Sequence, residues 1–465
     1  MSAITIPQRF AAIIEKISKT AKSVNFETYA VGGFVRDIFL NREPKDLDIM
    51  VEDKNDKGNA RAGMEFAGAL AGKYALSAPV IFERFGTAKL LIDGEEVEFI
   101  MPRKEYYCAD SRNPDTEIGS LQQDALRRDF TVNALFLRLS DMYVLDLTGK
   151  GFDDMHNKII RVTDPANAEI IFAQDPLRIL RAMRQKLQLG FEIESLTFEA
   201  MKISSSRIHI VAPERIRDEI NKILVQKKPS EAFYMMKEIG LLSEILPEIE
   251  ALYGLRQPEK YHNDGVFDHT FKVLDRTNSD LLLRMAALLH DAGKLKACKN
   301  EDGKISFYGH EIYGAEIAGN ILKRLRYPKE FARKTVNIIR NHMRPQNYNR
   351  RWKDSALRRF AADCGEETDY VLELAKADYG KDAADKNVFE FSERLENLNK
   401  KGLLYPKEEL VSGGELMEYF AMTGGDWIKK AKKCIAEARF ENPALTKDEA
   451  LRLVKEMLNK SGRQI

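Results

Sequence analysis

The pattern of apolar and polar residues divides the chain into two regions. Up to about residue 160, helical and strand-like periods alternate, and from residue 164 onward the period is helical. Residues 6–24 and 57–73 have the helical period, whereas residues 85–100 predict a hairpin that turns at Asp93-Gly94. The buried positions predicted for the two helices are Phe10, Ile13, Ile14, Ile17, Gly63, Phe66, Ala67 and Leu70. We therefore expect an α/β head with a small mixed sheet, followed by a mostly α-helical body.

Two further segments of the head are predicted from shorter patterns. Residues 130–134 alternate between apolar and polar side chains, which predicts a half-buried strand. Residues 144–161 predict a strand, a glycine turn and a second strand ahead of the helical region. In that region, Asp175 and Pro176 are typical of a helix start, and we expect Asp175 to be the N-cap.

A paired glycine follows the first predicted strand. Gly32 and Gly33 open a short helical pattern, and Arg36 lies one turn further on. Glycines at a strand-to-helix turn let the backbone come close to a ligand, and the helix start favours an anion. The spacing therefore suggests a site for a phosphate group that Arg36 can also reach.

Two carboxylates follow within one short strand pattern. Asp46 and Asp48 alternate with apolar residues, so they face the same side, and Glu98 on a later predicted strand is a candidate third carboxylate. An isolated Asp-x-Asp is often only a solvated strand face, and so is a lone strand glutamate. Beside a glycine turn, however, clustered carboxylates suit Mg²⁺ shared with substrate phosphates, which indicates nucleotidyl transfer.

Two later motifs combine arginine with aspartate. The first contains Arg127, Arg128, Asp129 and Asn133, and the second contains Asp175, Arg178 and Arg181. A surface salt bridge would explain the first motif, and a capped, basic helix would explain the second. Both alternatives remain open from the residues alone.

A histidine-rich cluster lies in the helical region. It contains His269, His290, Asp291, His310, His342 and Asp378. Histidines and carboxylates on successive helices can converge on a metal ion inside a bundle, although a lone histidine is more often structural. Four of the chain's 7 histidines gathering there favours a metal site.

Composition restricts the partners and the compartment. The 465 residues include 73 basic and 72 acidic side chains, so a nucleic acid would have to be held by local patches. The 4 cysteines lack metal-site spacing and predict reduced thiols in a cytoplasmic protein. No long apolar segment or signal-peptide pattern is present, and we expect no membrane contact.

The first set of motifs resembles a known family. Gly-Gly-Phe-Val-Arg-Asp at 32–37, Asp-Leu-Asp at 46–48 and Arg-Arg-Asp-Phe-Thr-Val-Asn-Ala at 127–134 are similar to signatures of class II tRNA nucleotidyltransferases and bacterial poly(A) polymerases. The resemblance implies addition of CMP, CMP and AMP to tRNA 3′ ends from CTP and ATP, with Mg²⁺. It implies that Asp46, Asp48 and Glu98 are catalytic, and that Asp46 and Asp48 hold the metal. The nucleotide-binding residues that it implies are Gly32, Gly33, Arg36, Arg127, Arg128, Asp129, Asn133, Asp175, Arg178 and Arg181.

The histidine cluster resembles the metal-binding signature of HD phosphohydrolase domains. His269, His290-Asp291 and Asp378 match that signature, and His310 and His342 occupy positions that often add ligands or bind phosphate. The resemblance implies a divalent metal of unassigned identity and hydrolysis of a phosphoester whose nature stays open. We therefore expect a catalytic head at 1–160, a nucleotide-recognising neck at 161–250, an HD domain at 251–395 and a tRNA-binding tail at 396–465.

Several features leave the exact activity open. Gln174 stands where the family usually has Glu, and its effect on nucleotide selectivity is left open. Residues 103–123 are polar and predict a mobile loop, and similar enzymes that add only cytidines have this segment shortened. An A-adding enzyme or a poly(A) polymerase would share the motifs. An RNA-binding HD phosphohydrolase is an alternative of another class, and the oligomeric state is not predicted.

The tail offers weaker signals. Residues 394–406 are polar and predict a linker. Glycine pairs at 413–414 and 424–425 each open a helical pattern, and the second helix carries Lys429, Lys430, Lys432 and Lys433. This pattern suits an RNA backbone, but an ordinary solvated helical hairpin explains it equally well.

Overall fold

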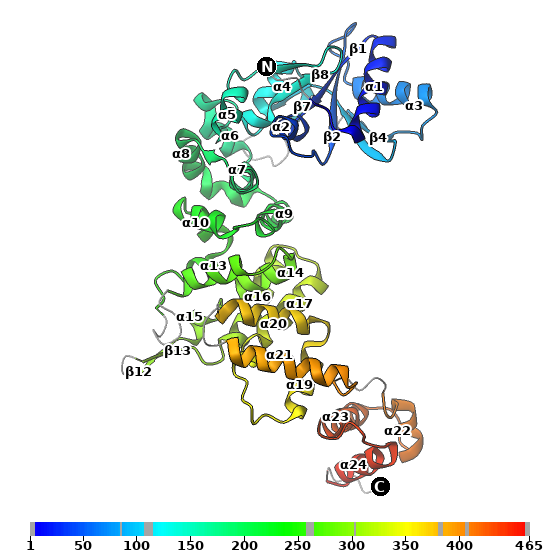
Figure 1. The fold of residues 1–465 in the computed structure, drawn as a ribbon, viewed down its shortest axis with the longest axis vertical. Coiled ribbons are helices and arrows are strands. Elements are labelled where there is room, and N and C mark those ends of the chain that lie inside the picture. The colour runs from blue at the N-terminus through cyan, green and yellow to red at the C-terminus, as the bar shows by residue number, and fades with distance from the viewer. Residues whose placement is uncertain are drawn as a thin grey trace. The chain divides into compact units, whose positions relative to one another are not determined.

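The computed structural model describes residues 5–83, 86–106, 115–256, 265–301, 304–379, 385–404 and 409–460 (Figure 1). The chain forms two compact units, Met1–Ile245 and Leu246–Ile465. Strands are concentrated in the first part of the first unit, and helices make up most of the rest. The predicted α/β head and helical body are therefore confirmed.

The head is built on a seven-stranded mixed sheet in the order β3-β4-β5-β2-β1-β8-β9. The pair β2–β5 is parallel and the other neighbouring pairs are antiparallel. The strands are β1 (Phe26–Val31), β2 (Leu47–Asp53), β3 (Val80–Phe82), β4 (Thr87–Ile92), β5 (Glu95–Ile100), β8 (Leu135–Arg138) and β9 (Tyr143–Asp146). The predicted hairpin is β4–β5, in which Asp93 and Gly94 both have positive φ. That conformation matches the right-handed twist of the two strands.

Two helices lie together beside this sheet (Figure 1). They are α1 (Gln8–Ser23) and α3 (Ala62–Tyr74), and all eight residues predicted to be their apolar faces are buried. Helix α3 begins at residue 62 and not at 57. The preceding turn is stabilised by Asp53, whose carboxylate accepts hydrogen bonds from the Asn55 backbone nitrogen (2.8 Å) and the Asn59 side chain (3.0 Å).

Two predictions of local structure in the head are wrong, and aspartate side chains explain both. Residues Thr131–Asn133 form the 3₁₀ helix η2 and not a strand, because Asp129 accepts hydrogen bonds from the Phe130 backbone and the Asn133 side chain. Helix α5 (Gly151–Asn157) lies between β9 and β10 (Ile159–Ile160), where only a turn was predicted. The Asp146 carboxylate accepts from the backbone nitrogens of residues 148, 149 and 152, which bends the chain into that helix.

The predicted loop 103–123 is partly regular. Strands β6 (Arg103–Tyr106) and β7 (Asp115–Ile118) pair as a hairpin, and α4 begins at Leu121 and ends at Arg127. Residues 107–114, including Cys108, lie outside the described residues. The helix start is fixed by a capping box between Ser120 and Gln123.

Short helices complete the first unit. They are α2 (Gly33–Phe39), η3 (Pro165–Asn167), α6 (Ala168–Gln174), α7 (Leu177–Leu189), α8 (Ser195–Ser204), η4 (Ser205–Ile210), α9 (Pro213–Leu224), α10 (Ser230–Glu238) and α11 (Leu241–Ile245), with the short strand β11 (Glu192–Ile193) paired to β10. Helix α7 packs against α9, and Arg184 on α7 donates to Glu219 on α9 at 2.7 Å. The prediction that Asp175 is an N-cap is wrong, because Pro176 occupies the N-cap position of α7.

The second unit begins with a helical bundle. Its helices are α12 (Pro247–Glu250), α13 (Val266–Arg276), α14 (Leu281–Leu289), α15 (Lys294–Ala297), α16 (His310–Arg324), α17 (Lys329–Asn341), α18 (Met343–Gln346), α19 (Asp354–Cys364), η5 (Gly365–Glu367), α20 (Thr368–Tyr379) and α21 (Asp385–Lys400). A small hairpin, β12 (Lys299–Glu301) and β13 (Lys304–Ser306), precedes α16. Helix α21 covers much of the predicted linker 394–406, because Leu395 and Leu398 are buried in the bundle.

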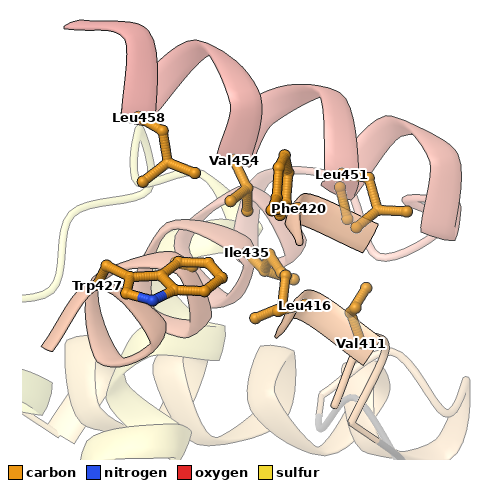
Figure 2. Close-up of a cluster of buried hydrophobic side chains, with 10 residues drawn as sticks. Val411, Leu416, Phe420, Trp427, Ile435, Leu451, Val454 and Leu458 are labelled. Atoms are coloured by element: carbon orange, nitrogen blue, oxygen red, sulfur yellow. The ribbon is translucent and has the colours of Figure 1, made fainter. Parts of the chain in front are cut away.

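The tail is a three-helix cluster of α22 (Gly413–Phe420), α23 (Asp426–Glu441) and α24 (Lys447–Lys460). Figure 2 shows its apolar centre, in which Trp427, Phe420 and Leu451 come from the three different helices. Helices this short depend on such packing for stability. Arg358 on α19 donates to the Phe440 carbonyl at 2.8 Å and joins the tail to the bundle.

Two global expectations can be compared with the described residues. Cys298, Cys364 and Cys434 are free thiols. No described helix has the length and apolar character that crossing a membrane requires.

Candidate active sites

The glycine turn of the head lies between β1 and α2. Gly32 has φ 70° and ψ −137°, a backbone conformation that residues other than glycine rarely adopt. A Cβ at Gly32 would lie 3.4 Å from Nη1 of Arg128, and one at Gly33 would lie 3.4 Å from Nη2 of Arg36. The backbone turn is therefore flanked by two guanidinium groups, as an anion site requires.

We predict that Gly32→Ala strains this turn. The substitution forces an unfavourable φ at a cost of roughly 1–3 kcal/mol and presses on Arg128. Its expected results are weaker nucleotide binding and a lower free energy of unfolding of the head, measured by hydrogen exchange of head peptides in urea. Gly68→Ala is the matched control. A Cβ at Gly68, inside α3, meets no described atom within 4 Å, so this change should stabilise the head by up to ~1 kcal/mol.

Two carboxylates, Asp48 and Glu98, are neighbours in the sheet beside this turn, and a third, Asp46, precedes one of their strands. Asp48 on β2 lies opposite Val31 of β1 and opposite Glu98 of β5 in the parallel pair. Asp46 is exposed and immediately precedes β2. Burial and the neighbouring Glu98 carboxylate raise the pKa of Asp48 to about 6, and Asp46 adds to this effect. The cations near Asp48 therefore do not offset the negative charge, and the donor set fits a divalent cation.

Glu98 differs from its neighbour Glu96 on the same strand. Glu96 forms an ion pair with Lys89 at 2.6 Å, and its side chain is 65% exposed. Glu98 is half-buried beside Asp48. The alternative considered for Glu98, a solvated strand residue, therefore describes its neighbour Glu96 better than Glu98 itself.

The two arginines of the first motif are held by an aspartate that the sequence analysis did not assign to the site. Asp124 is fully buried, and its carboxylate accepts from Nε of Arg127 at 2.8 Å and from Nε of Arg128 at 2.9 Å. Burial alone would raise the pKa of Asp124, but Arg128 and Arg127 outweigh burial and lower it. Asp124 thus fixes Arg128 beside Gly32. Its spacing of three and four residues from the arginines on one helix was the available signal.

Asp129 forms the centre of a second buried network. Arg36 donates to the Asn133 side-chain oxygen at 2.8 Å, and Asn133 donates to Asp129 at 2.9 Å. Arg181 on α7 donates to the same carboxylate at 2.6 and 2.9 Å. Burial alone would raise the pKa of Asp129, but Arg181 and Asn133 outweigh it and lower it well below its usual value. This network joins α2, η2 and α7, so it links the Gly32-Gly33 turn to the helical neck.

The predicted nucleotide-binding residues Asp175 and Arg178 have separate partners in this structure. Arg178 is buried and donates to the Arg127 carbonyl at 2.8 Å. The Asp175 carboxylate forms an ion pair with Arg215 of α9 at 3.3 Å. Arg178 therefore lies against the arginine motif, while Asp175 faces α9.

In the second unit, the six predicted metal ligands converge. All are buried, and they come from α13, α16, α20 and the ends of α14 and α17. His269 Nε2 lies 2.7 Å from Asp378 Oδ1, and His290 Nε2 lies 3.3 Å from Asp291 Oδ2. Two triplets have ligand atoms within 4.8 Å of one another: His269, His290 and Asp291, and Asp291, His310 and His342.

Glycines make this convergence possible. A Cβ at Gly293 would collide with the His310 backbone oxygen, and one at Gly314 would lie 3.1 Å from the His290 backbone oxygen. Only glycine at 293 lets the loop after His290-Asp291 lie directly on α16. This packing explains the glycine in the Ala-Gly-Lys sequence that follows Asp291.

The donor chemistry of the cluster fits a metal. His290 Nδ1 donates to the Ala287 carbonyl at 2.8 Å, which directs Nε2 into the cluster. Among the described residues, no hydrogen bond of good geometry reaches this fully buried Nε2. Asp291 and Asp378 outweigh burial and raise the pKa of His290 to about 10.

A cavity of about 360 Å³ opens onto the cluster, and its lining includes Asp291, His310 and Asp378. Two further polar residues at this cavity were missed by the sequence analysis. Lys294 lies 2.7 Å from Asp291 Oδ2, and Gln346 donates to Asp378 Oδ2. Lys294 follows Asp291 by three residues on a helical turn, which is a usable signal, whereas Gln346 had none.

In the tail, acidic side chains lie at the starts of the two helices that were considered as sites for an RNA backbone. At the start of α22, Ser412 and Glu415 form a capping box that uses the helix-start nitrogens. Asp426 lies in the first turn of α23. Lys432 forms an ion pair with Glu409, whereas Lys429, Lys430 and Lys433 are exposed. The basic face of α23 is thus the remaining candidate for RNA contact.

Three parts of the chain match known family profiles. Residues 28–161 match the Poly A polymerase head domain, and residues 190–253 match the "Probable RNA and SrmB- binding site of polymerase A". Residues 261–379 match the HD domain. The first profile covers the glycine turn and the carboxylates of the head, and the third covers the histidine cluster, whereas Asp175, Arg178 and Arg181 lie between the first two profiles.

Curated relatives include enzymes of different specificity. The chain is 30% identical to a CC-adding tRNA nucleotidyltransferase of Thermus thermophilus, over 91% of this chain and 92% of that protein. It is 31% identical to an A-adding tRNA nucleotidyltransferase of Deinococcus radiodurans, over 71% and 78%. It is 33% identical to a multifunctional CCA protein of Neisseria gonorrhoeae, over 68% and 74%.

Solved structures share the fold across nearly the whole chain. A Bacillus stearothermophilus CCA-adding enzyme in complex with CTP has a TM-score of 0.67 at 20% identity, covering 99% of this chain and 100% of that one. A Thermotoga maritima CCA-adding enzyme complexed with tRNA has a TM-score of 0.60 at 19% identity, covering 97% and 96%. The profiles and the relatives together show that the chain belongs to the tRNA nucleotidyltransferase and poly(A) polymerase family and is a nucleotidyltransferase that carries an HD domain.

Proposed function

We propose that the head adds CMP, CMP and AMP to the 3′ ends of tRNA from CTP and ATP. The observation that carries this proposal is the meeting of Asp48 and Glu98 with a glycine turn flanked by Arg36 and Arg128. Carboxylates for a cation and guanidinium groups for phosphates are the two requirements of nucleotidyl transfer. Relatives named for CC addition, A addition and CCA addition support a tRNA acceptor.

The residues take the following proposed roles. Asp46 and Asp48 would hold Mg²⁺, with Glu98 as a third catalytic carboxylate beside Asp48. The bound ion would lower the pKa of the terminal 3′-hydroxyl of the tRNA and neutralise the triphosphate. Gly32, Gly33, Arg36 and Arg128 hold phosphates, and Arg127 supports the same region. Asp129 and Asn133 orient Arg36 and Arg181 through the buried network. Asp175 and Arg178 recognise the base edge, with Arg181 beside them.

The specificity proposal depends on the segment 103–123. Similar enzymes that add only cytidines have this segment shortened, and here it keeps its length. We therefore favour complete CCA addition over CC addition, although the Thermus relative is a CC-adding enzyme. A-adding and poly(A)-adding enzymes share the motifs and are separated only by experiment. We assign the protein to the cytoplasm and its tail to tRNA contact.

The test offers labelled CTP and ATP, singly and together, to tRNA ending in the discriminator base, in C and in CC. CCA addition predicts CMP on the first two ends and AMP on the CC end. CMP alone would mean CC addition, AMP on CC alone would mean A addition, and long tails on a generic RNA would mean a poly(A) polymerase. No incorporation on any end would refute the proposed function of the head.

A second function is proposed for the HD cluster, hydrolysis of a phosphoester. The supporting observation is a set of six buried histidines and aspartates at a cavity that also contains Lys294. The bound divalent metal, of unassigned identity, would activate water for attack on phosphorus. Release of inorganic phosphate from a phosphomonoester, or ring opening of a 2′,3′-cyclic phosphate, by protein carrying Asp48→Asn tests this function separately. Hydrolysis without nucleotide addition by the unaltered chain would favour an RNA-binding phosphohydrolase.

A further inference from the structure

One straight row of residues crosses five strands of the head sheet. Adjacent members of the row are register partners, and from β1 to β3 they are Val31, Asp48, Glu98, Lys89 and Val80. Residues directly opposite each other in a sheet present their side chains to the same face. The glycine turn follows β1 immediately. The turn, the two carboxylates, the lysine and the edge strand therefore succeed one another along one line.

The two halves of this face are covered differently. Over β1 and β2 it is buried beneath α4, whose Ala125 packs into one apolar cluster with Met50. Over β4 and β3 the described side chains are exposed, with exposed fractions of 57% for Leu91, 59% for Val80 and 39% for Phe82. An apolar strip that includes an aromatic ring thus lies open beside the carboxylates of the head.

Lys89 is the cation between the carboxylates and this strip. Its ammonium group lies 2.6 Å from the carboxylate of Glu96, which is largely exposed. A lysine beside carboxylates is charged at neutral pH. An ion pair with an exposed partner contributes little to stability, so a phosphate group can replace Glu96 as the partner of Lys89.

The order along the row assigns a side to each substrate of nucleotide addition. The acceptor 3′-oxygen bonds to the α-phosphorus, the bond from that phosphorus to the β-phosphate oxygen breaks, pyrophosphate leaves, and the hydroxyl proton passes to solvent. The attacking and leaving oxygens lie in line, on opposite sides of the phosphorus. The guanidinium groups at the glycine turn place the leaving phosphates at the β1 end of the row. The acceptor end therefore approaches from the other side, over β5 and β4.

We infer that the exposed face formed by Lys89, Leu91, Val80 and Phe82, here called the acceptor face, binds the single-stranded 3′ end of the acceptor RNA. Lys89 contacts its last phosphodiester, and Phe82 stacks on one of its last bases. A cation beside an aromatic ring on an open sheet suits single-stranded RNA, because the charge pairs with the backbone and every base has a face that stacks. The inference rests on the proposed nucleotide addition and names the surface that holds its acceptor.

The direct test is a photo-crosslink that needs no nucleotide addition. A tRNA ending in C, with 4-thiouridine as its last nucleotide, is bound to the full chain with Mg²⁺ and an α,β-methylene analogue of CTP, and is then irradiated. Peptide mapping should place the crosslink on β3 or β4. Absence of a crosslink from both strands would overturn the inference, even where nucleotide addition itself is observed. A crosslink there without any addition by the unaltered chain would refute the proposed function and keep the acceptor face.

Lys89→Gln tests the phosphate contact. The KM for tRNA should rise roughly tenfold while the KM for CTP stays unchanged, because a charged hydrogen bond to the acceptor alone is lost. The slope of log KM for tRNA against log salt concentration should fall by about 0.7, which is the value for one contact to a single strand. Lys89→Arg should restore both quantities.

Lys16→Gln is the matched control for Lys89, because Lys16 is also half-buried and forms a 2.6 Å ion pair, with Asp93, but lies on α1. It should leave the KM for tRNA and the salt slope unchanged. An unchanged salt slope in Lys89→Gln, or equal effects of the two substitutions, would contradict the phosphate contact.

Phe82→Ser tests the stacking contact. Loss of one base stack should raise the KM for tRNA by roughly tenfold and lower the crosslink yield. Ile81→Ser is the matched control, because Ile81 is a similarly exposed residue of the same strand but pairs with Ala88 and faces the opposite side of the sheet. Hydrogen exchange of head peptides checks that both variants are folded. Equal crosslink yields in the two folded variants would contradict the role of Phe82.

Discussion

Asp48→Asn is expected to abolish nucleotide addition and leave the head at least as stable as before. Losing several kcal/mol of charge stabilisation in the transition state lowers kcat/KM roughly a thousandfold or more. Burial, Glu98 and Asp46 raise the pKa of Asp48, so its charge opposes folding at neutral pH. A neutral amide removes that repulsion. Steady-state CTP incorporation and hydrogen exchange of head peptides measure the two effects.

A loss of activity without a loss of stability distinguishes a functional carboxylate from a structural one. Glu96→Gln is the matched control, because Glu96 lies on the same strand but is exposed and paired with Lys89. It should change kcat/KM little, whereas Glu98→Gln should lower it strongly. Normal turnover in Asp48→Asn, or a large loss in Glu96→Gln alone, would contradict the assigned site.

Asp124→Ala is expected to lower the free energy of unfolding of the head by about 3–5 kcal/mol. The substitution leaves Arg127 and Arg128 side by side and partly buried without their shared carboxylate. Nucleotide binding should weaken as well, because Arg128 is no longer fixed beside Gly32. Tryptophan fluorescence would not report this change, since both tryptophans, Trp352 and Trp427, lie in the second unit. Hydrogen exchange of α4 and β8 in urea is the suitable measurement.

The acid dependence of this effect follows from the pKa. The arginines hold the pKa of Asp124 below its usual value, so its stabilisation is complete above the unfolded pKa of about 3.9 and is lost as pH falls towards the folded pKa. The stability difference between the wild-type protein and Asp124→Asn should therefore shrink in acid. Asp141→Ala removes a comparable but exposed partner of Arg138 and should change stability by less than ~1 kcal/mol. Equal losses at Asp124 and Asp141 would contradict the role of burial.

Short-range patterns predicted much of the head correctly. Helices α1 and α3, the β4–β5 hairpin and the Gly32-Gly33 turn each depend on residues a few positions apart. Helix α5 and the 3₁₀ turn η2 could not be predicted in this way. At α5, Asp146 accepts from several backbone nitrogens, and at η2, Asp129 accepts from the Phe130 backbone nitrogen and the Asn133 side chain. These hydrogen bonds override the apolar period.

Long-range partners limited the prediction of the sites. The cluster of His269 with Asp378 joins residues 109 positions apart, and the gathering of histidines in the helical region and the resemblance to HD domains indicated it. Asp175 has a local helix-start signal, yet its carboxylate pairs with Arg215 across the neck. Gln346 contacts Asp378 only because α18 and α20 pack together. Such contacts depend on how separate helices pack, and the local spacing of residues does not predict that packing.

The most direct test of the central claim is the mass of one product. A tRNA ending in the discriminator base is incubated with the protein, Mg²⁺, CTP and ATP, and its 3′ extension is resolved by mass spectrometry. The proposed function predicts an extension by two cytidylates and one adenylate that then stops, and no extension with Asp48→Asn. An unextended tRNA, or an extension that continues with further adenylates, would contradict it.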